Sequence, residues 1–160
     1  MVLYYGKDGN LRNYLNKSKY YIDYKSKIEK LVDIARGLLD IHNAEKVHKD
    51  FHSGNILFWE VPYISDLGMC QPANSNKKQS VKKEGIYGVL PYMAPEVLRG
   101  YQYKKAADIY SFGIIMNEFI SEETPYNDIP HDHVLTVKIC KGLRPKISQD
   151  ILKITCRFDY

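Results

Sequence analysis

HKDFHSGN, residues 48–55, carries the strongest signal in this chain for both fold and chemistry. It places Asp50 five residues before Asn55, and Asp66 follows eleven residues later in ISDLG, residues 64–68. Carboxylate and amide oxygens are the hard ligands that magnesium prefers in proteins. One carboxylate that can act as a base, with an amide and a second carboxylate that can hold magnesium, supplies the groups that phosphoryl transfer needs.

Helical spacing precedes this stretch. Asn10 opens a short helical segment that carries Leu11, Tyr14 and Leu15. A longer helix is predicted over residues 26–42, because its apolar residues recur at three- and four-residue intervals. The apolar stripe consists of Ile28, Leu31, Val32, Ala35, Leu38, Leu39 and His42. We expect this helix to pack against the core with the face that carries that stripe.

Short β-prone segments surround the polar stretch. They cover residues 46–48, 56–59 and 63–65, and the last two are joined by a tight connection at residues 60–62. A further β-prone segment, residues 2–5, ends at a cluster of turn residues. These segments predict small hairpins that carry polar motifs at their ends.

The second half of the chain combines a polar segment with helices. Residues 69–87 lack apolar periodicity and predict a mobile loop. Residues 109–120 are apolar nearly all round a helix, which predicts a buried one. A last helix is expected over residues 133–140, closing at Gly142. With the short strands, these elements predict a mainly α fold with short β-hairpins.

Composition and charge are those of one ordinary domain. The chain has 160 residues, of which 44% are hydrophobic and 26% charged, enough for a single sizeable core. A net charge of +4 with scattered lysines argues against a nucleic-acid surface. Three cysteines without a CxxC pair favour a reducing compartment and do not indicate zinc. No apolar run approaches membrane length, so we expect no membrane contact and a cytosolic or nuclear location, with the cytoplasm preferred.

Taken in order, the motifs resemble the C-terminal lobe of a eukaryotic-type protein kinase of the tyrosine-kinase-like group. Residues 48–50 with Asn55 are similar to the catalytic loop of that family. Residues 66–68 are similar to its magnesium-binding triplet, and residues 94–96 to the end of its activation segment. The resemblance extends from residue 1 to about residue 146.

The resemblance implies a fold and a set of residue roles. The fold is a protein-kinase-like C-lobe lacking the N-lobe, in which residues 1–160 form a partial kinase domain with the hinge, the C-lobe and an activation segment at residues 66–96. Asp50 would accept the hydroxyl proton of the substrate and orient its oxygen. Asn55 and Asp66 would hold magnesium against the phosphates. Asp50 and Asn55 are therefore the implied catalytic residues, and Asn55 and Asp66 the implied metal ligands.

Other residues resemble those that surround the nucleotide in the family. Leu57 resembles the residue beneath adenine, and Tyr4 and Gly6 fall where the hinge backbone hydrogen-bonds that ring. The cofactors implied are ATP and Mg²⁺. His48 and Leu67 resemble members of the side-chain spine that joins the two lobes, although plain core packing would equally account for them.

Departures from the family pattern bear on specificity. Lys49 replaces the usual Arg. A Lys keeps the positive charge but cannot bind a phosphate through two parallel hydrogen bonds as Arg does, so regulation by phosphorylation of the activation segment is in doubt.

His52 stands where serine/threonine kinases usually carry a Lys. It is four residues from His48, but in a β-prone loop that spacing does not place two ligands on one face, so we expect a structural His48 and a His52 that lines the active site. Gly54 lacks the Arg common in tyrosine kinases, and Pro91-Tyr92 differs from their basic-Trp pair, so serine/threonine specificity is favoured.

The ends of the sequence suggest truncation. Before residue 48 it contains no Gly-rich loop, strand Lys or Glu-bearing helix, and it stops before the last helices of the family. We expect this chain alone to be weak or inactive, because positioning and charge stabilisation carry phosphoryl transfer. We also expect apolar surface at the exposed lobe edges to favour self-association.

Two functions of different classes remain open. The first is that of a protein kinase, a transferase that moves phosphate from ATP to Ser or Thr hydroxyls of proteins. The second is a non-catalytic, pseudokinase-like module that binds proteins. Both predict a protein substrate or partner and no nucleic acid.

Overall fold

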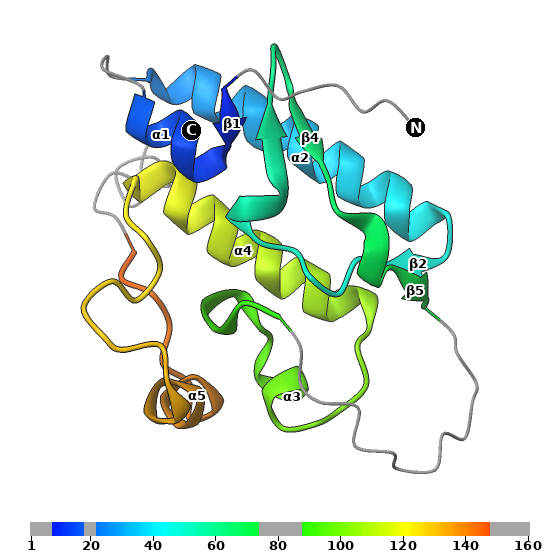
Figure 1. Cartoon of the computed structure of the whole chain (residues 1–160), viewed down its shortest axis with the longest axis vertical. Coiled ribbons are helices and arrows are strands. Elements are labelled where there is room, and N and C mark those ends of the chain that lie inside the picture. The colour runs from blue at the N-terminus through cyan, green and yellow to red at the C-terminus, as the bar shows by residue number, and fades with distance from the viewer. Residues whose placement is uncertain (1–7, 18–21, 74–87, 148–160) are drawn as a thin grey trace, which may run out of the picture.

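The computed structural model describes residues 8–17, 22–73 and 88–147 (Figure 1). The strand expected at residues 2–5 and most of the loop expected at residues 69–87 lie outside these ranges. The helices are α1 (Leu11–Lys17), α2 (Tyr24–Asn43), α3 (Pro95–Leu98), α4 (Lys105–Ser121) and α5 (His133–Cys140). The 3-10 turns are η1 (Ser53–Asn55), η2 (Leu67–Met69) and η3 (Leu90–Tyr92).

The strands form two small antiparallel sheets. They are β1 (Gly9–Asn10), β2 (Lys46–Val47), β3 (Ile56–Phe58), β4 (Pro62–Ile64) and β5 (Gln71–Pro72). One sheet has the order β1-β3-β4, with Leu57 facing Asn10 on one side and Tyr63 on the other. The other pairs β2 with β5. The predicted β3–β4 hairpin is confirmed, whereas β5 lies in a segment expected to be loop.

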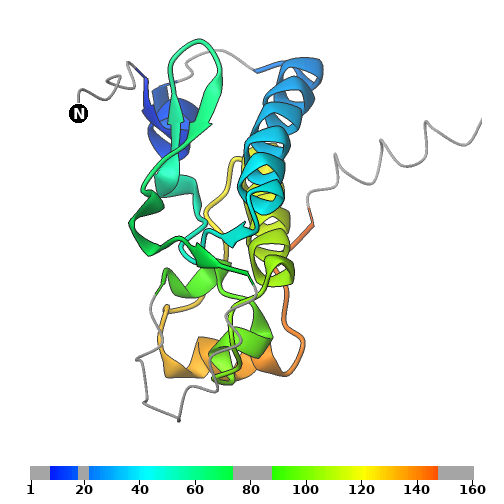
Figure 2. The ribbon, with the colours of Figure 1, turned by 90° about the vertical axis from the view of Figure 1, so that its right-hand side faces the viewer.

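Two long helices form the base on which the polar loops rest. Figures 1 and 2 together show α2 and α4 side by side, with the β3–β4 hairpin in front of them and α3 and α5 at the opposite end of the molecule. Helix α2 contacts both β4 and α4. The segment between β2 and β3 therefore lies over a layer of two packed helices.

The core has two parts. The larger cluster joins α1, α2, β3 and α4 through buried residues such as Leu11, Ile34, Phe58 and Phe119. The rings of Tyr14 and Phe58 stack at a centroid distance of 4.2 Å within it. The smaller cluster joins α3, α5 and the start of α4. Helix α4 contributes to both clusters and so connects the two ends of the molecule.

Helix α2 confirms the predicted helix but not all of the predicted buried stripe. Its buried residues are Lys27, Leu31, Ile34, Leu38 and His42. Ile28, Val32 and Leu39, which the sequence assigned to the stripe, are 38%, 42% and 55% exposed. Two apolar rows run along this helix, and packing against α4 and β4 selects one of them. Lys27 is buried because its ammonium group bonds the carbonyl of Ile120 at 3.2 Å and Glu122 at 2.6 Å.

Helix α4 is also confirmed, but it is not buried all round. Ile109 and Met116 are 54% and 37% exposed. Its buried face instead includes three polar residues, Asp108, Ser111 and Glu118. A helix that is apolar nearly all round is usually buried, but this one is buried only in part. Its buried polar residues bond the segments that pack on α4.

Side-chain caps begin α1, α2 and α5. The Asn10 side chain accepts the Asn13 N–H at 2.9 Å, and Asp23 accepts the Ser26 N–H at 3.0 Å. Asp132 accepts the N–H groups of Val134 and Leu135 at the start of α5.

Among the described residues, no helix combines the length and the apolar character that crossing a membrane requires.

Candidate active site

A buried carboxylate holds the start of the polar stretch in place. Asp108, which is 1% exposed, accepts the N–H of His48 at 2.8 Å and the N–H of Lys49 at 3.1 Å. The Nε2 atom of His42 lies 3.0 Å from the same carboxylate. Lys49 has φ of +70°, a left-handed conformation that costs a residue with a side chain roughly 1 kcal/mol. Asp108 thus stabilises a strained turn just before Asp50.

His48 connects this turn to the segment that carries Asp66. Its side chain is fully buried, and its Nδ1 accepts the N–H of Asp50 at 3.3 Å. Nδ1 is therefore unprotonated, so Nε2 carries the proton and donates to the carbonyl of Ser65 at 3.0 Å. The structural role expected for His48 agrees with this geometry.

Asp50 and Asn55 lie against each other. The Nδ2 of Asn55 donates to the backbone carbonyl of Asp50 at 2.8 Å and lies 3.4 Å from its Oδ2. The NH2 group of the Asn55 amide is therefore the part that contacts Asp50. Within the described part of the chain, Oδ1 of Asn55 makes no hydrogen bond, so the atom that can ligate magnesium is left available.

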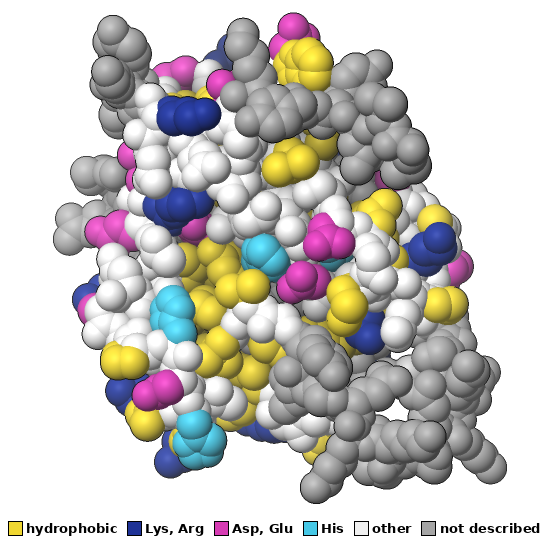
Figure 3. Space-filling model, viewed as in Figure 1, with side chains coloured by type: hydrophobic (Ala, Val, Ile, Leu, Met, Phe, Trp, Pro, Cys, Tyr) yellow, Lys and Arg dark blue, Asp and Glu magenta, His cyan; other side chains and the backbone are white. Residues whose placement is uncertain are grey.

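Asp66 lies at the junction of β4 and η2. Ser65, immediately before it, donates through both its N–H and its Oγ to the carbonyl of Asn55, at 2.8 and 2.9 Å. Asp66 itself is exposed and left-handed, with φ of 57°, and its carboxylate accepts only the N–H of Gly68 at 3.4 Å among the described residues. Figure 3 shows acidic and histidine side chains gathered near the middle of one face, beside an apolar area.

The predicted nucleotide residues are only partly covered by the structure. Leu57 is half-buried in the middle of β3, and Tyr4 and Gly6 lie outside the described residues. Leu67 is 54% exposed, so plain core packing does not account for it.

Tyr103 is a titratable group close to this site. Burial, followed by the negative charges of Asp50 and Asp108, raises the pKa of its phenol to about 12 from the ordinary value of 10.0. The ammonium group of Lys49 lies 5.6 Å from the centre of its ring and 3.0 Å from Oε1 of Gln71. The neutral phenol is therefore the form that the fold stabilises.

Tyr103→Phe is expected to weaken the loss of stability at alkaline pH. Between about pH 10 and about pH 12 the unfolded chain releases a proton that folded Tyr103 retains, so this residue's contribution to stability falls as the pH rises. Phe has no such proton. Urea unfolding at a series of pH values measures the difference, with Tyr63→Phe, at a 58% exposed position, as the matched control. Equal slopes in wild type and Tyr103→Phe would contradict the assignment.

A second buried carboxylate, missed by the sequence analysis, anchors the other side of the loop. Glu118 is fully buried and pairs with Arg12 of α1, whose Nε lies 3.1 Å from its Oε1. The hydroxyl of Tyr92 donates to Oε2 of Glu118 at 2.6 Å, and Ser53 bonds the same hydroxyl at 2.9 Å. Burial and then the Glu118 charge raise the pKa of Tyr92 well above its usual range. The one available signal was an acidic residue inside an apolar helix, which requires a partner.

Glu118→Ala is expected to lower the free energy of unfolding by about 3–5 kcal/mol, because it leaves a partly buried Arg12 and a buried Tyr92 hydroxyl without their acceptor. Urea unfolding measures the change. Glu123→Gln, an exposed carboxylate just past α4, is the control and should change stability by less than about 0.5 kcal/mol. Equal effects of the two substitutions would show that the network contributes nothing.

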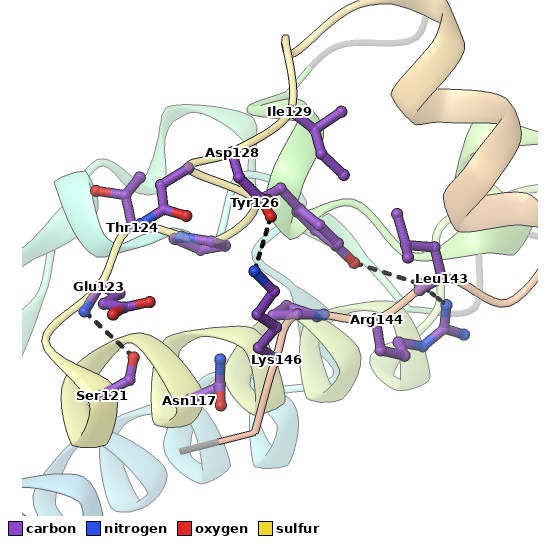
Figure 4. Close-up of a pocket in the computed structure, with 13 residues that line it drawn as sticks. Asn117, Ser121, Glu123, Thr124, Tyr126, Asp128, Ile129, Leu143, Arg144 and Lys146 are labelled. Carbon is purple, nitrogen blue, oxygen red and sulfur yellow. Dashed lines mark hydrogen bonds and ion pairs between the residues drawn. The ribbon is translucent and has the colours of Figure 1, made fainter. Parts of the chain in front are cut away.

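A pocket of about 90 Å³ is lined by residues from the last turns of α4 and from the segments that follow it. In Figure 4, Asn117 and Ser121 come from α4, while Lys146 extends to Asp128, with 2.9 Å between its ammonium nitrogen and Oδ2. The residues that line it include none of the predicted site residues. The chemistry expected from the sequence therefore lies outside this pocket.

Comparison with known proteins agrees with the family that the motifs resemble. Residues 1–154 match the model of the family described as protein tyrosine and serine/threonine kinase. A probable serine/threonine-protein kinase of Dictyostelium discoideum is 31% identical over 166 residues, covering 92% of this chain and 11% of the relative. From the same organism, the probable serine/threonine-protein kinases gdt2 and drkA are each 31% identical, covering 97% and 89% of this chain. The chain spans only 10% of gdt2 and 22% of drkA. This chain belongs to the family of protein tyrosine and serine/threonine kinases.

Proposed function

We propose that this chain carries the base and the magnesium ligands of an ATP-dependent phosphotransferase that acts on Ser and Thr hydroxyls of proteins. The observation that supports this most directly is the contact between Asn55 and Asp50. It orders the candidate base and the candidate ligand in one loop, while Oδ1 of Asn55 remains available. We also infer that the described helices correspond to the C-lobe of the domain and that the tyrosine-kinase-like group is the closest match in pattern.

The roles of the residues follow from their atoms. Asp50 accepts the proton of the incoming hydroxyl and orients its oxygen toward the phosphorus. Among the described residues, the side chains that form a hydrogen bond or an ion pair with Asp50 are Asn55 and His52. Both approach Oδ2, which leaves Oδ1 for the hydroxyl. Asn55 and Asp66 fit magnesium, since each presents an oxygen with little or no competition from other described donors. The ion would neutralise charge on the phosphate oxygens.

The preference for Ser and Thr over Tyr has two supports. The relatives compared above are named as probable serine/threonine kinases. Gly54 also provides no side chain beside Asp50, unlike the Arg common in tyrosine kinases. Phosphoamino-acid analysis of the products tests this preference, and phosphotyrosine as the main product would contradict it.

The proposed reaction is tested with radiolabelled ATP, magnesium and a mixture of protein substrates. Both the 160-residue chain and the longest polypeptide that its gene encodes are assayed. Label transferred to protein, dependent on magnesium, is the expected result. No transfer by either polypeptide, with partner binding retained, would instead favour the non-catalytic binding module.

A further inference from the structure

His52 has one ring nitrogen whose protonation state follows from its contacts. Its Nδ1 accepts the backbone N–H of Gly54 at 3.0 Å, so this nitrogen carries no proton. The proton of the neutral ring is therefore on Nε2. That atom lies 3.6 Å from Oδ2 of Asp50, which makes the N–H group of His52 face the candidate base.

Gly54 provides the space that this ring occupies. A Cβ atom at residue 54 would lie 2.7 Å from Cε1 and 2.8 Å from Nδ1 of His52, distances that real Cβ contacts essentially never show. The ring of Tyr92 lies close to the imidazole, with a centroid distance of 5.9 Å and an interplanar angle of 46°. Tyr92 is itself held by Glu118. The imidazole is thus in contact with a glycine and close to an anchored aromatic ring.

Two donors approach the same oxygen of Asp50. Nδ2 of Asn55 is 3.4 Å from Oδ2, and Nε2 of His52 is 3.6 Å away. Within the described residues, Oδ1 makes no hydrogen bond or ion pair. The 3.6 Å separation is longer than a hydrogen bond, but catalytic contacts of this kind often tighten only when the substrate is bound.

We propose that His52 is a positioning residue for Asp50, directing its Nε2–H at Oδ2 so that Oδ1 receives the substrate proton, and that Gly54 is required to seat it. This inference rests on the proposed function for its catalytic meaning. Its geometric content, the tautomer and the Asp50 contact, does not depend on activity.

The simplest competing role for His52 is a turn cap. Its side chain caps η1 through the Gly54 N–H, and an Asn side chain can cap such a turn equally well. Asn is too short to place a donor where Nε2 lies. His52→Asn therefore keeps the cap and removes the contact with Asp50, whereas His52→Ala removes both.

The kinetic test compares these two variants with wild type in the active polypeptide. His52→Asn should lower kcat by about tenfold to about a hundredfold, the range expected for a lost hydrogen bond to a charged group, with the KM for ATP unchanged. His52→Lys, which restores a donor without the cap, should recover part of the loss. Wild-type kcat in His52→Asn would overturn the proposal and leave His52 as a cap.

The spectroscopic test works even if no activity is found. Long-range proton–nitrogen NMR spectra of the imidazole should show the Nε2–H tautomer, and Asp50→Asn should shift the Nε2 resonance. Asp40→Asn, an equal charge change at an exposed position of α2, should not shift it. The Nδ1–H tautomer, or equal spectra in Asp50→Asn and wild type, would overturn the proposal. Absent transfer with these spectra as expected would count against the proposed function alone.

Gly54 provides an independent check. Gly54→Ala should displace the ring and lower kcat to a similar extent as His52→Asn. Because the two substitutions remove the same contact, their effects should not add: Gly54→Ala should cost little more in the His52→Asn background. Fully additive losses would show that Gly54 acts independently of His52.

Discussion

Asp50→Asn is expected to lower the rate of phosphoryl transfer by about a hundredfold to about ten-thousandfold, the usual contribution of a positioned general base. The substitution keeps the size of the side chain but removes its ability to accept a proton at neutral pH. It should leave nucleotide affinity nearly unchanged, since the proposed magnesium ligands are Asn55 and Asp66. Radiolabel transfer gives the rate, and calorimetric titration with ATP and magnesium gives the affinity.

The control for this experiment is Asp33→Asn, which removes an equal charge from α2, where Asp33 forms an ion pair with the exposed Arg36. Its rate should equal that of wild type. If Asp50→Asn retained more than about half of the wild-type rate, Asp50 would not be the base, because a base contributes far more than twofold. In that case the geometry around Asp50 would support only a binding role.

Asp108→Ala is expected to lower the free energy of unfolding by about 3–5 kcal/mol, the cost of removing one member of a buried, hydrogen-bonded charged group. The N–H groups of His48 and Lys49 and the Nε2 of His42 would lose their acceptor in a site with almost no solvent. Lys49 would also lose the contact that stabilises its left-handed backbone. Urea unfolding, with the midpoint compared at constant slope, measures the effect.

Asp108→Asn keeps the shape of the side chain and removes its charge, so it distinguishes the contribution of the charge to stability from that of the shape. It keeps one acceptor oxygen and should cost less than Asp108→Ala, about 1–3 kcal/mol for the N–H left unpaired. Asp33→Ala, at the surface of α2, should change stability by less than about 0.5 kcal/mol. A loss below about 1 kcal/mol in Asp108→Ala would contradict the view that this carboxylate holds the loop.

Much of the secondary structure was predictable because its signals are local. The spacing of Leu11, Tyr14 and Leu15 predicted α1, and the tight connection at residues 60–62 predicted the β3–β4 hairpin. Apolar periodicity likewise predicted α2, α4 and α5. These patterns depend on residues three or four apart, or on turn residues between two short strands, and do not require knowledge of the fold.

Burial was less predictable. The sequence assigned Ile28, Val32 and Leu39 to the buried stripe of α2, and the structure exposes them while burying Lys27. Which of two adjacent apolar rows is buried depends on where α4 and β4 pack, and neither position can be read from α2 itself. The pairing of β5 with β2 was missed for the same reason, since residues 71 and 47 are brought together only by the fold.

The identity and order of the chemical groups are properties of the sequence alone. Asp50, Asn55 and Asp66 are recognisable by residue type and spacing, and the contact between Asp50 and Asn55 spans only five residues. The contacts that hold these groups in place, in contrast, cannot be read from the sequence alone. Asp108 bonds His48 across 60 residues, and Glu118 bonds Arg12 across 106. Such contacts form only after α4 has packed beneath the loop, because burial and geometry, not spacing, determine which distant polar groups meet.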